Sequence, residues 1–548
     1  MSRFVDTMVA TARGAGGRSR GITTGEPGTP VRRTWAEVNE RAARTAGALV
    51  AAGVAPGASL AILAGDPAAI APAVQAVWLA GGSTTMLHQP TARTDLAEWA
   101  HDTLRVLAMI DARLVLLGSP FDALAAVLDE HGVAYRTLDS LDGDPLAEPV
   151  EVAESATALL QLTSGSTADP KAVRITHGNL WSNAKAMETA AVLDPETDRM
   201  VSWLPLFHDM GMVGFLTVPM LFGIDLVKVT PVDFLARPTL WPDLISRYRG
   251  TITAAPNFAY AIAARRMAGV ADGAFDLSTL RIALNGAEPI DPVAVKSFTD
   301  AGERFGLRAE CVLCAYGMAE TTLGVAFAPA FTGIAVDHVD PEELEAGRRA
   351  VPVPADAPGA RSFPLLGPPL PGLEVQVVDD AGAVRGEREV GQLRVRGEAV
   401  TPGYLTVDGP RDTQDADGWL DTGDEGYVVD GQVVVCGRRK DVIIMGGRNI
   451  YPTDIERAAT SVEGVRAGNA VAVRLDAGTR RERFAVVVES RLAGEDEAVK
   501  QLSKQISARV VDAVGLRPYT VVVLKPGSLP KTPSGKLRRS AASVLVPG

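Results

Sequence analysis

Short apolar runs alternate with longer helix-like segments through roughly the first three hundred residues. The apolar runs predict buried strands, which lie at 59–64, 113–118, 158–162, 225–229, 251–255 and 281–284. The segments between them predict helices, which lie near 67–80, 121–131, 177–191, 238–248 and 291–304. Thr34 and Glu37 match a capping box ahead of a further helix, which is expected to stop at Gly53. Because alternating strands and helices form parallel sheets covered on both faces, this part is predicted to be α/β.

The pattern changes after about residue 330. The stretch 331–363 is rich in Pro, Ala and acidic residues and is predicted to be an insertion that forms a long surface excursion. Alternation with period two then predicts a small antiparallel β subdomain at about 365–437. The remaining segment is mixed, with strand runs at 470–473, 484–488 and 521–524. The expected organisation is a large N-terminal domain of two α/β subdomains plus the β subdomain (1–437), and a small mobile α+β C-terminal domain (440–548).

The composition is that of a folded, acidic protein. Hydrophobic residues make up 47% and charged residues 22% of the 548 residues, close to the averages for soluble globular proteins. The formal charge of −12 argues against a general affinity for nucleic acid or anionic lipid, which requires basic residues. The chain begins without the apolar core of a signal peptide, and no apolar stretch is long enough to span a bilayer.

The three cysteines cannot form a disulfide framework, so a reducing cytoplasm is the expected location. Cys311 and Cys314 have the spacing of a metal or redox pair. No second pair or His cluster accompanies them, so core packing is expected for both.

The most distinctive local feature is the segment 163–171, Thr-Ser-Gly-Ser-Thr-Ala-Asp-Pro-Lys, which follows the predicted strand at 158–162. A turn of small hydroxyl residues and Gly presents backbone N–H groups and hydroxyls to one point, and Lys171 adds a positive charge. This chemistry suits the phosphates of a nucleotide, although the Walker spacing is absent. Taken alone, the segment is equally consistent with an ordinary flexible Ser/Thr loop.

Further segments follow in a characteristic order, at 316–322, 419–424, 437–441, 446–452 and 530–536. Together with 163–171 they resemble the adenylate-forming superfamily of acyl-CoA synthetases, luciferases and peptide-synthetase adenylation domains, over nearly the whole chain. The segments 202–212, 256–260, 285–289 and 339–347 are similar to the fatty acyl-AMP ligase branch. In that branch an insertion packs between the lobes and hinders the CoA-dependent half-reaction.

The resemblance implies that ATP is bound by residues of several segments. Those implied to hold the β- and γ-phosphates are Thr163, Ser164, Gly165, Ser166, Thr167 and Lys171. Those implied to surround the adenine are Gly286, Ala287, Glu288, Tyr316 and Gly317, with Tyr316 stacking on the base. Thr321 is implied to bind the α-phosphate, Asp424 both ribose hydroxyls, and Arg438 ribose or phosphate. The family usually has Gly where this chain has Ala168 and Ala172, which would stiffen the phosphate loop.

The resemblance also implies the residues of the chemical step. Glu320 is expected to ligate Mg²⁺, and Lys536 is expected to be the catalytic lysine that bridges the carboxylate and the α-phosphate. Lys440 occupies the hinge position at the boundary 438–440, and His208 a position that guards the carboxylate end of the acyl pocket. Candidates to line that pocket are Trp203, Met210, Met212 and Phe258.

The expected function is therefore ATP- and Mg²⁺-dependent activation of a fatty or bulky hydrophobic carboxylic acid to an acyl-adenylate, with release of pyrophosphate. The acyl group would pass to an acyl carrier protein bearing phosphopantetheine or to a partner enzyme. Gly446 and Gly447 match glycines beside the pantetheine tunnel of thioester-forming relatives, so a complete acyl-CoA ligase stays open as an alternative. A second alternative is a regulator that binds nucleotide without turnover, against which the retention of Glu320 and Lys536 argues.

Overall fold

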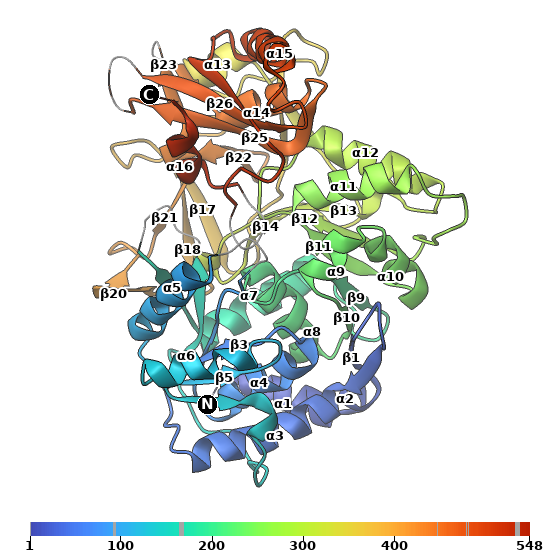
Figure 1. Cartoon of the computed structure of the whole chain (residues 1–548), viewed down its shortest axis with the longest axis vertical. Coiled ribbons are helices and arrows are strands. Elements are labelled where there is room, and N and C mark those ends of the chain that lie inside the picture. Colours follow the sequence, from blue (N-terminus) through green and yellow to red (C-terminus); the bar gives the residue numbers. More distant parts are fainter. Residues whose placement is uncertain are drawn as a thin grey trace. The chain divides into compact units, whose positions relative to one another are not determined.

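The computed structural model of the chain (Figure 1) describes residues 2–90, 95–163, 169–445, 448–477, 479, 482–531 and 537–547. The chain divides into two compact units. Unit 1 consists of Met1–Ile334, Gly367–Glu374 and Val395–Leu420, and unit 2 of Ala335–Leu366, Val375–Arg394 and Asp421–Gly548. The chain therefore enters unit 2 at residues 335, 375 and 421, and returns to unit 1 at residues 367 and 395.

Unit 1 contains two eight-stranded sheets. The first has the order β14-β13-β12-β11-β9-β10-β1-β2. Its strands are β1 (Gly21–Thr24), β2 (Val31–Thr34), β9 (Arg199–Ser202), β10 (Asp225–Lys228), β11 (Ile252–Ala255), β12 (Ile282–Asn285), β13 (Val312–Gly317) and β14 (Gly324–Phe327). The strands from β13 to β1 run parallel, and only the two edge strands, β14 and β2, are antiparallel to their neighbours.

The second sheet has the order β20-β19-β8-β7-β4-β3-β5-β6. Its strands are β3 (Ser59–Leu63), β4 (Ser83–Met86), β5 (Ala112–Leu117), β6 (Tyr135–Thr137), β7 (Thr157–Thr163), β8 (Lys171–Thr176), β19 (Gly403–Thr406) and β20 (Gly409–Asp412). Strands β7 to β6 are parallel, whereas β20, β19 and β8 each pair antiparallel with the next strand of the order. The prediction of parallel α/β sheets is confirmed for the five strands from β7 to β6 and for the six strands from β13 to β1, and antiparallel strands extend both sheets.

Helices cover these sheets. Those of unit 1 are α1 (Arg3–Arg13), α2 (Ala15–Ser19), α3 (Trp35–Ala51), α4 (Pro67–Leu79), α5 (Leu96–Met109), α6 (Ala125–Glu130), α7 (His177–Ala190), α8 (Val218–Phe222), α9 (Pro231–Ala236), α10 (Leu240–Tyr248), α11 (Asn257–Met267) and α12 (Pro292–Glu303). The capping box at the start of α3 is confirmed, because Thr34 and Glu37 each bond the other's backbone N–H. Helices α11 and α12 lie side by side, as Figure 1 shows.

The predicted strands and helices of this part are confirmed, with ends that differ by at most four residues. The sequence analysis missed β4, whose first three residues are Ser83, Thr84 and Thr85. All four residues of β4 are buried. A pattern search for apolar residues does not find such a strand, because hydroxyl side chains fill its interior positions.

Unit 2 is built around a three-stranded sheet, β25-β26-β27, in which β25 and β26 are antiparallel and β26 and β27 parallel. Helices α14 and α15 lie beside one another against it (Figure 1). The bounds are β25 (Val465–Leu475), β26 (Arg483–Ser490), β27 (Thr520–Leu524), α14 (Pro452–Thr460), α15 (Asp496–Val514) and α16 (Arg539–Ala542). A short hairpin of β23 (Ile443–Met445) and β24 (Arg448–Ile450) precedes α14.

A four-stranded sheet follows the insertion in the chain, with the order β17-β18-β21-β22. Its strands are β17 (Leu373–Val378), β18 (Gly391–Gly397), β21 (Leu420–Val429) and β22 (Gln432–Arg438). These strands contain the three period-two runs on which the β subdomain was predicted.

The stretch 331–363, predicted to be a surface excursion, contains regular secondary structure. It forms a hairpin of β15 (Val336–Val339) and β16 (Arg361–Pro364), with the helix α13 (Pro341–Glu345) between them. Val339, Leu344 and Phe363 are buried in a hydrophobic cluster with residues of β21 and β22. Most residues of the insertion are exposed or partly exposed, while these three side chains and the buried ion pair of Glu345 with Arg361 anchor it to unit 2.

Two further observations bear on function. No helix within the described ranges combines the length and the apolar character that a bilayer crossing needs. Cys311 and Cys314 are buried and carry free thiols, and burial raises the pKa of each to about 12. The expectation of core packing for this pair is therefore confirmed.

Candidate active site

The residues expected around adenine meet at the carboxyl ends of two neighbouring strands of the first sheet, β12 and β13. Strand β12 ends at Asn285 and pairs with β13, so that the turn Gly286–Ala287–Glu288 lies beside the end of β13, where Tyr316 stands. Gly286 approaches this strand closely, since a Cβ there would meet the carbonyl oxygen of Ala315 at 3.0 Å. The carboxyl ends of parallel strands are where α/β folds bind ligands.

The Glu288 carboxylate is engaged in this turn. Its Oε1 accepts a hydrogen bond from the backbone N–H of Phe258 at 2.6 Å, which fixes the start of α11 against the turn. Ala287 adopts a positive φ of 68°, an unusual conformation for a residue with a Cβ. The turn is thus held in one shape before any ligand binds.

Lys171 and Glu320 are brought together by a residue that the sequence analysis did not single out. The Lys171 ammonium lies 4.0 Å from the ring centroid of Tyr404, a cation–π contact. The Tyr404 hydroxyl donates a hydrogen bond to Glu320 Oε1 at 2.6 Å. Strand β19, which carries Tyr404, pairs with β8, which carries Lys171. Tyr404 therefore links the lysine that is expected to bind phosphate to the expected metal ligand.

Thr163 ends β7 opposite Lys171 on β8. Its Oγ1 is buried and finds no hydrogen-bond partner among the described residues. Buried hydroxyls are normally paired, so an orphan hydroxyl at the entrance of the phosphate loop fits a site that a ligand oxygen completes. The next residues of this loop, Ser164, Gly165, Ser166 and Thr167, lie outside the described residues.

Thr321 is buried in the tight turn that follows β13. Gly317 is the last residue of β13 and is partly exposed. The Thr321 hydroxyl donates to the carbonyl of Met318 at 2.9 Å, and its backbone N–H donates to the same oxygen at 3.1 Å. The carbonyl of Glu320 in turn accepts from the backbone N–H of Thr401 at 2.8 Å. The expected Mg²⁺ ligand is therefore held from both its main chain and its side chain.

The chemistry of Glu320 fits a magnesium ion that is bound partly by phosphate. Within the described part of the chain, no three His, Cys, Asp or Glu side chains are grouped so as to hold a metal ion. Mg²⁺ is usually bound by one or two carboxylates together with substrate phosphates. One fixed carboxylate beside the phosphate loop meets that requirement.

His208 stands at the start of the π-helix η3 (Met210–Thr217), which Asp209 caps. The Nδ1 atom of His208 lies 2.6 Å from Oδ1 of Asp209, and the same oxygen accepts from the backbone N–H of Met210 at 2.7 Å. His88 packs against Phe207, the residue before His208, and burial lowers the pKa of His88 to about 4 with a further contribution from His208. Asp209 thus orients the His208 ring, with Nδ1 engaged.

Two of the candidate acyl-pocket residues, Trp203 and Phe258, belong to an aromatic cluster that also contains Phe234. Trp203, which follows β9, stacks on Phe234 with ring centroids 4.1 Å apart and packs edge-on against Phe258 at 6.3 Å. Met210 and Met212 are buried in η3. The sequence analysis named four of these residues and missed Phe234, which lies on the short helix α9.

Asp424 and Arg438 lie opposite each other on the antiparallel strands β21 and β22 of unit 2. Arg438 Nε is 2.9 Å from Asp424 Oδ1, and the Asp424 side chain is only 5% exposed against 49% for Arg438. A nearly buried carboxylate under a half-exposed guanidinium forms a compact polar patch. The structure therefore brings together the two residues expected to contact the ribose.

The remaining residues that the sequence analysis singled out belong to the C-terminal segment. Lys440 lies in the short 3₁₀ turn η6 (Arg439–Asp441), directly after β22, and its carbonyl accepts from Arg474 at 3.4 Å. The catalytic candidate Lys536 and the two glycines Gly446 and Gly447 lie outside the described residues.

This fold is that of adenylate-forming enzymes. The model of the AMP-binding enzyme family matches residues 17–405, and the model of the AMP-binding enzyme C-terminal domain matches residues 447–541. The chain therefore belongs to the AMP-binding enzyme family. It is an acid-activating ligase that forms an acyl-adenylate from ATP.

The chain is similar to several named proteins. It is 56% identical, over 100% of both chains, to Rv1013 of Mycobacterium tuberculosis, which is provisionally named as a ligase. It is 35% identical to the medium-chain-fatty-acid–[acyl-carrier-protein] ligase JamA of Moorena producens, over 71% of this chain and 67% of JamA. Among solved structures, a fatty acyl-adenylate ligase from a study of the Escherichia coli and Legionella pneumophila enzymes has a TM-score of 0.89 at 30% identity, covering 100% of this chain and 98% of that one.

Proposed function

We propose that the acid is a fatty acid and that its acyl group passes from the adenylate to an acyl carrier protein rather than to CoA. The likeness to JamA and to fatty acyl-adenylate ligases supports this choice of acid and acceptor. The observation that carries the proposal is the packing of the insertion onto the C-terminal segment within unit 2.

The proposed roles of the site residues follow from their geometry. Thr163 and Lys171 bind the β- and γ-phosphates, and Glu320, held by Tyr404, ligates Mg²⁺. The ion would neutralise phosphate charge as pyrophosphate leaves. His208, oriented by Asp209, lies at the acid's carboxylate. Because little covalent chemistry is asked of the protein, positioning and charge stabilisation supply most of the rate.

The other contacts to ATP are proposed on the same basis. Tyr316, Gly317 and the turn Gly286–Ala287–Glu288 hold the adenine, and Thr321 the α-phosphate. Asp424 and Arg438 hold the ribose. Lys536, on the strength of the family resemblance, bridges the carboxylate and the α-phosphate as negative charge develops between them.

The C-terminal segment is tied to the insertion by a buried ion network. Glu345 at the end of α13 is fully buried and pairs with Arg361 of β16 and with Arg448 of β24, the latter at 2.5 Å. Arg361 also lies 3.2 Å from Asp454 of α14. Two residues of the insertion are thus joined to two residues that follow the proposed hinge.

A second pair connects the insertion to the neighbourhood of the ribose site. Arg348 makes a bidentate contact with Glu425, at 3.0 and 3.1 Å, and Glu425 directly follows Asp424. Tyr451, in the linker before α14, donates to Glu425 at 3.3 Å. The insertion therefore contacts both the β21 strand and the C-terminal segment.

These contacts bear on the thioester step. The insertion leaves unit 1 at residue 334 and returns to it at residue 367, and both the insertion and Lys440 belong to unit 2. Rotation of the C-terminal segment about Lys440 would have to move the insertion or break the ion network. Breaking a buried ion pair costs about 3–5 kcal/mol, which would oppose the rearrangement that CoA chemistry needs.

The test is a product assay with Mg²⁺-ATP, dodecanoate and either CoA or a phosphopantetheinylated carrier protein. Acyl-AMP that persists with CoA but is consumed by the carrier would support the proposal. Formation of acyl-CoA at a comparable rate would instead identify a complete acyl-CoA ligase. Arg361→Met, which removes the central cation of the network, is expected to raise acyl-CoA formation without raising adenylate formation. Lys296→Met, which removes a solvent-exposed ion pair on α12, is the matched control.

A further inference from the structure

The segment 203–209, which we call the acid loop, joins β9 of the first sheet to η3 and carries His208. One end of this loop is fixed to the first sheet. The buried side chain of Lys228, on β10, donates through Nζ to the carbonyl oxygens of Leu204 and Val229, at 2.5 and 2.9 Å. The acid loop is therefore held at Leu204 by a neighbouring strand of the sheet from which it starts.

The other end of the acid loop is held by the second sheet. The side-chain amide of Gln161, on β7, donates to the carbonyl of Phe207 at 2.9 Å and to that of Leu162 at 3.1 Å. Gln161 is only 5% exposed, so water competes little for these bonds. The Phe207 ring also packs edge-on against His88, which follows β4 of the same sheet, with ring centroids 5.5 Å apart. The second sheet thus holds both the main chain and the ring of Phe207.

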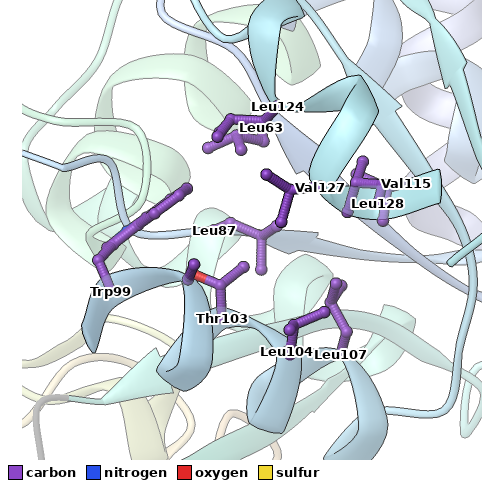
Figure 2. A pocket seen from close by; sticks show the side chains of 11 residues that line it. Leu63, Leu87, Trp99, Thr103, Leu104, Leu107, Val115, Leu124, Val127 and Leu128 are labelled. Atoms are coloured by element: carbon purple, nitrogen blue, oxygen red, sulfur yellow. The ribbon is translucent and has the colours of Figure 1, made fainter. Parts of the chain in front are cut away.

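His88 is itself fixed in place. Trp99 of α5 donates its indole N–H to the His88 carbonyl at 2.9 Å. Figure 2 shows Trp99 and Leu87, the residue before His88, among the side chains that line an apolar pocket beside α5. Because a hydrogen bond and apolar packing both hold this segment, Phe207 packs against a well-anchored surface.

The acid loop is built too tightly for Phe207 to move without His208. The backbone N–H of His208 donates to the carbonyl of Pro205 at 3.3 Å. The same carbonyl lies so close to η3 that a Cβ on Gly211 would meet it at 2.1 Å. A displacement of Phe207 is therefore expected to displace the His208 ring as well.

Gln161 also lies on the strand that leads into the phosphate loop. Thr163 ends β7 two residues later, and alternate residues of a strand point to the same face of the sheet. The buried hydroxyl of Thr163 has no hydrogen-bond partner among the described residues. The bond from Gln161 to the acid loop thus starts on the same face of β7 as the proposed phosphate contact.

From these contacts we infer that Gln161 is a positioning residue for adenylation. It aligns the acid loop with the phosphate loop, so that the carboxylate at His208 is placed to attack the α-phosphate of ATP. This inference rests on the proposed function, through the roles of His208 and Thr163, and extends it. Loss of the bond should slow the chemical step more than it weakens the binding of either substrate, because a misplacement of about 1 Å can cost about a hundredfold in rate.

The test replaces Gln161 with Met, which nearly keeps the size of the side chain and removes both hydrogen bonds. Gln161→Asn, whose amide is one methylene too short to reach the Phe207 carbonyl, is the second variant. Gln75→Met is the matched control, since Gln75 is a buried glutamine of α4 whose amide contacts Asn39 and Met220 instead. Urea denaturation measures the stability of each variant, so that loss of folding is told apart from loss of alignment.

The readouts are the single-turnover rate constant for pyrophosphate formation and the separate dissociation constants of ATP and of the acid. Both Gln161 variants are expected to lower the rate constant at least about tenfold and to leave each dissociation constant within about twofold. Gln75→Met should leave all three within about twofold. An unchanged rate constant in either Gln161 variant, or an equal loss in Gln75→Met, would overturn the inference.

Failure of the proposed function is read from the wild-type chain alone. If that chain activates only acids other than fatty acids, or forms acyl-CoA, the proposed function fails. The Gln161 variants are then compared with the acid that the wild-type chain does activate, so the inference is decided separately.

Discussion

The hydroxyl of Tyr404 donates a 2.6 Å hydrogen bond to Glu320, and the ring of the same residue carries the Lys171 ammonium at 4.0 Å. One side chain therefore fixes the positions of an acid and a base that come from distant parts of the sequence. The acid is the proposed Mg²⁺ ligand, and the base belongs to the proposed phosphate loop. The relation predicts that metal and phosphate binding depend on Tyr404.

Tyr404→Phe is expected to lower the rate of acid-dependent ATP–pyrophosphate exchange about tenfold and to raise the Mg²⁺ concentration for half-maximal rate. A hydrogen bond to a charged group is worth about 1.5–3 kcal/mol, and 1.4 kcal/mol corresponds to a factor of ten. The Phe ring keeps the contact with Lys171, so Tyr404→Ala should cost more. An unchanged Mg²⁺ dependence in Tyr404→Phe would show that Tyr404 does not position Glu320.

Asp424→Asn is expected to raise the KM for ATP about tenfold and to leave the KM for the acid nearly unchanged. The carboxylate is almost completely buried under Arg438, so its replacement removes both a ribose ligand and the partner of that guanidinium. Steady-state kinetics with each substrate varied in turn make the measurement. Equal increases in both KM values would point to a general distortion of the site.

The buried ion network predicts a stability effect as well as an effect on the acceptor. Arg361→Met leaves Glu345, a fully buried carboxylate, paired with Arg448. Removal of one member of a buried network typically costs about 3–5 kcal/mol, and urea denaturation followed by circular dichroism would measure the loss. The exposed pair of Lys296 and Asp300 should contribute little, so Lys296→Met serves as the control. Equal stability of the two variants would contradict this account.

Lys228 at the end of β10 predicts a dependence of stability on pH. Its side chain is 1% exposed, and its ammonium donates to the carbonyl oxygens of Leu204 and Val229. Burial lowers the pKa of Lys228 from 10.5 to about 7. Between these values the unfolded chain binds a proton that the folded chain does not, so stability rises with pH.

The comparison with Lys228→Met isolates this contribution from those of other groups. The stability of the wild-type chain relative to Lys228→Met should increase by about 2 kcal/mol between pH 7 and pH 9 and stay constant below pH 6. Urea denaturation of both proteins over this range makes the measurement. A difference that does not change with pH would mean that Lys228 titrates normally.

The alternation of strands and helices was readable from the sequence because buried parallel strands are continuous apolar runs, as in the strand at 158–162. The order of the site motifs likewise predicted residues that the fold brings together, such as Asp424 and Arg438. Tyr404 escaped notice because its role depends on the pairing of β19 with β8, which no local pattern encodes.

The sequence analysis missed the regular structure and the buried ion pair of the insertion for a different physical reason. Charged residues normally lie in solvent, and the sequence does not reveal that Glu345 and Arg361 neutralise each other inside unit 2. The burial of Lys228 is equally hard to predict, since a lysine at the end of an apolar strand suggests that this end of the strand is exposed to solvent. Burial of a charge depends on its partners, and those partners are distant in the chain.

The central claim is adenylation of a fatty acid without transfer to CoA. The most direct measurement is mass spectrometry of the products formed from Mg²⁺-ATP and dodecanoate, with and without CoA, by the wild-type chain and by Lys536→Ala. We predict dodecanoyl-AMP that persists in the presence of CoA, and none from Lys536→Ala. Rapid conversion to dodecanoyl-CoA, or full adenylate formation by Lys536→Ala, would contradict the account.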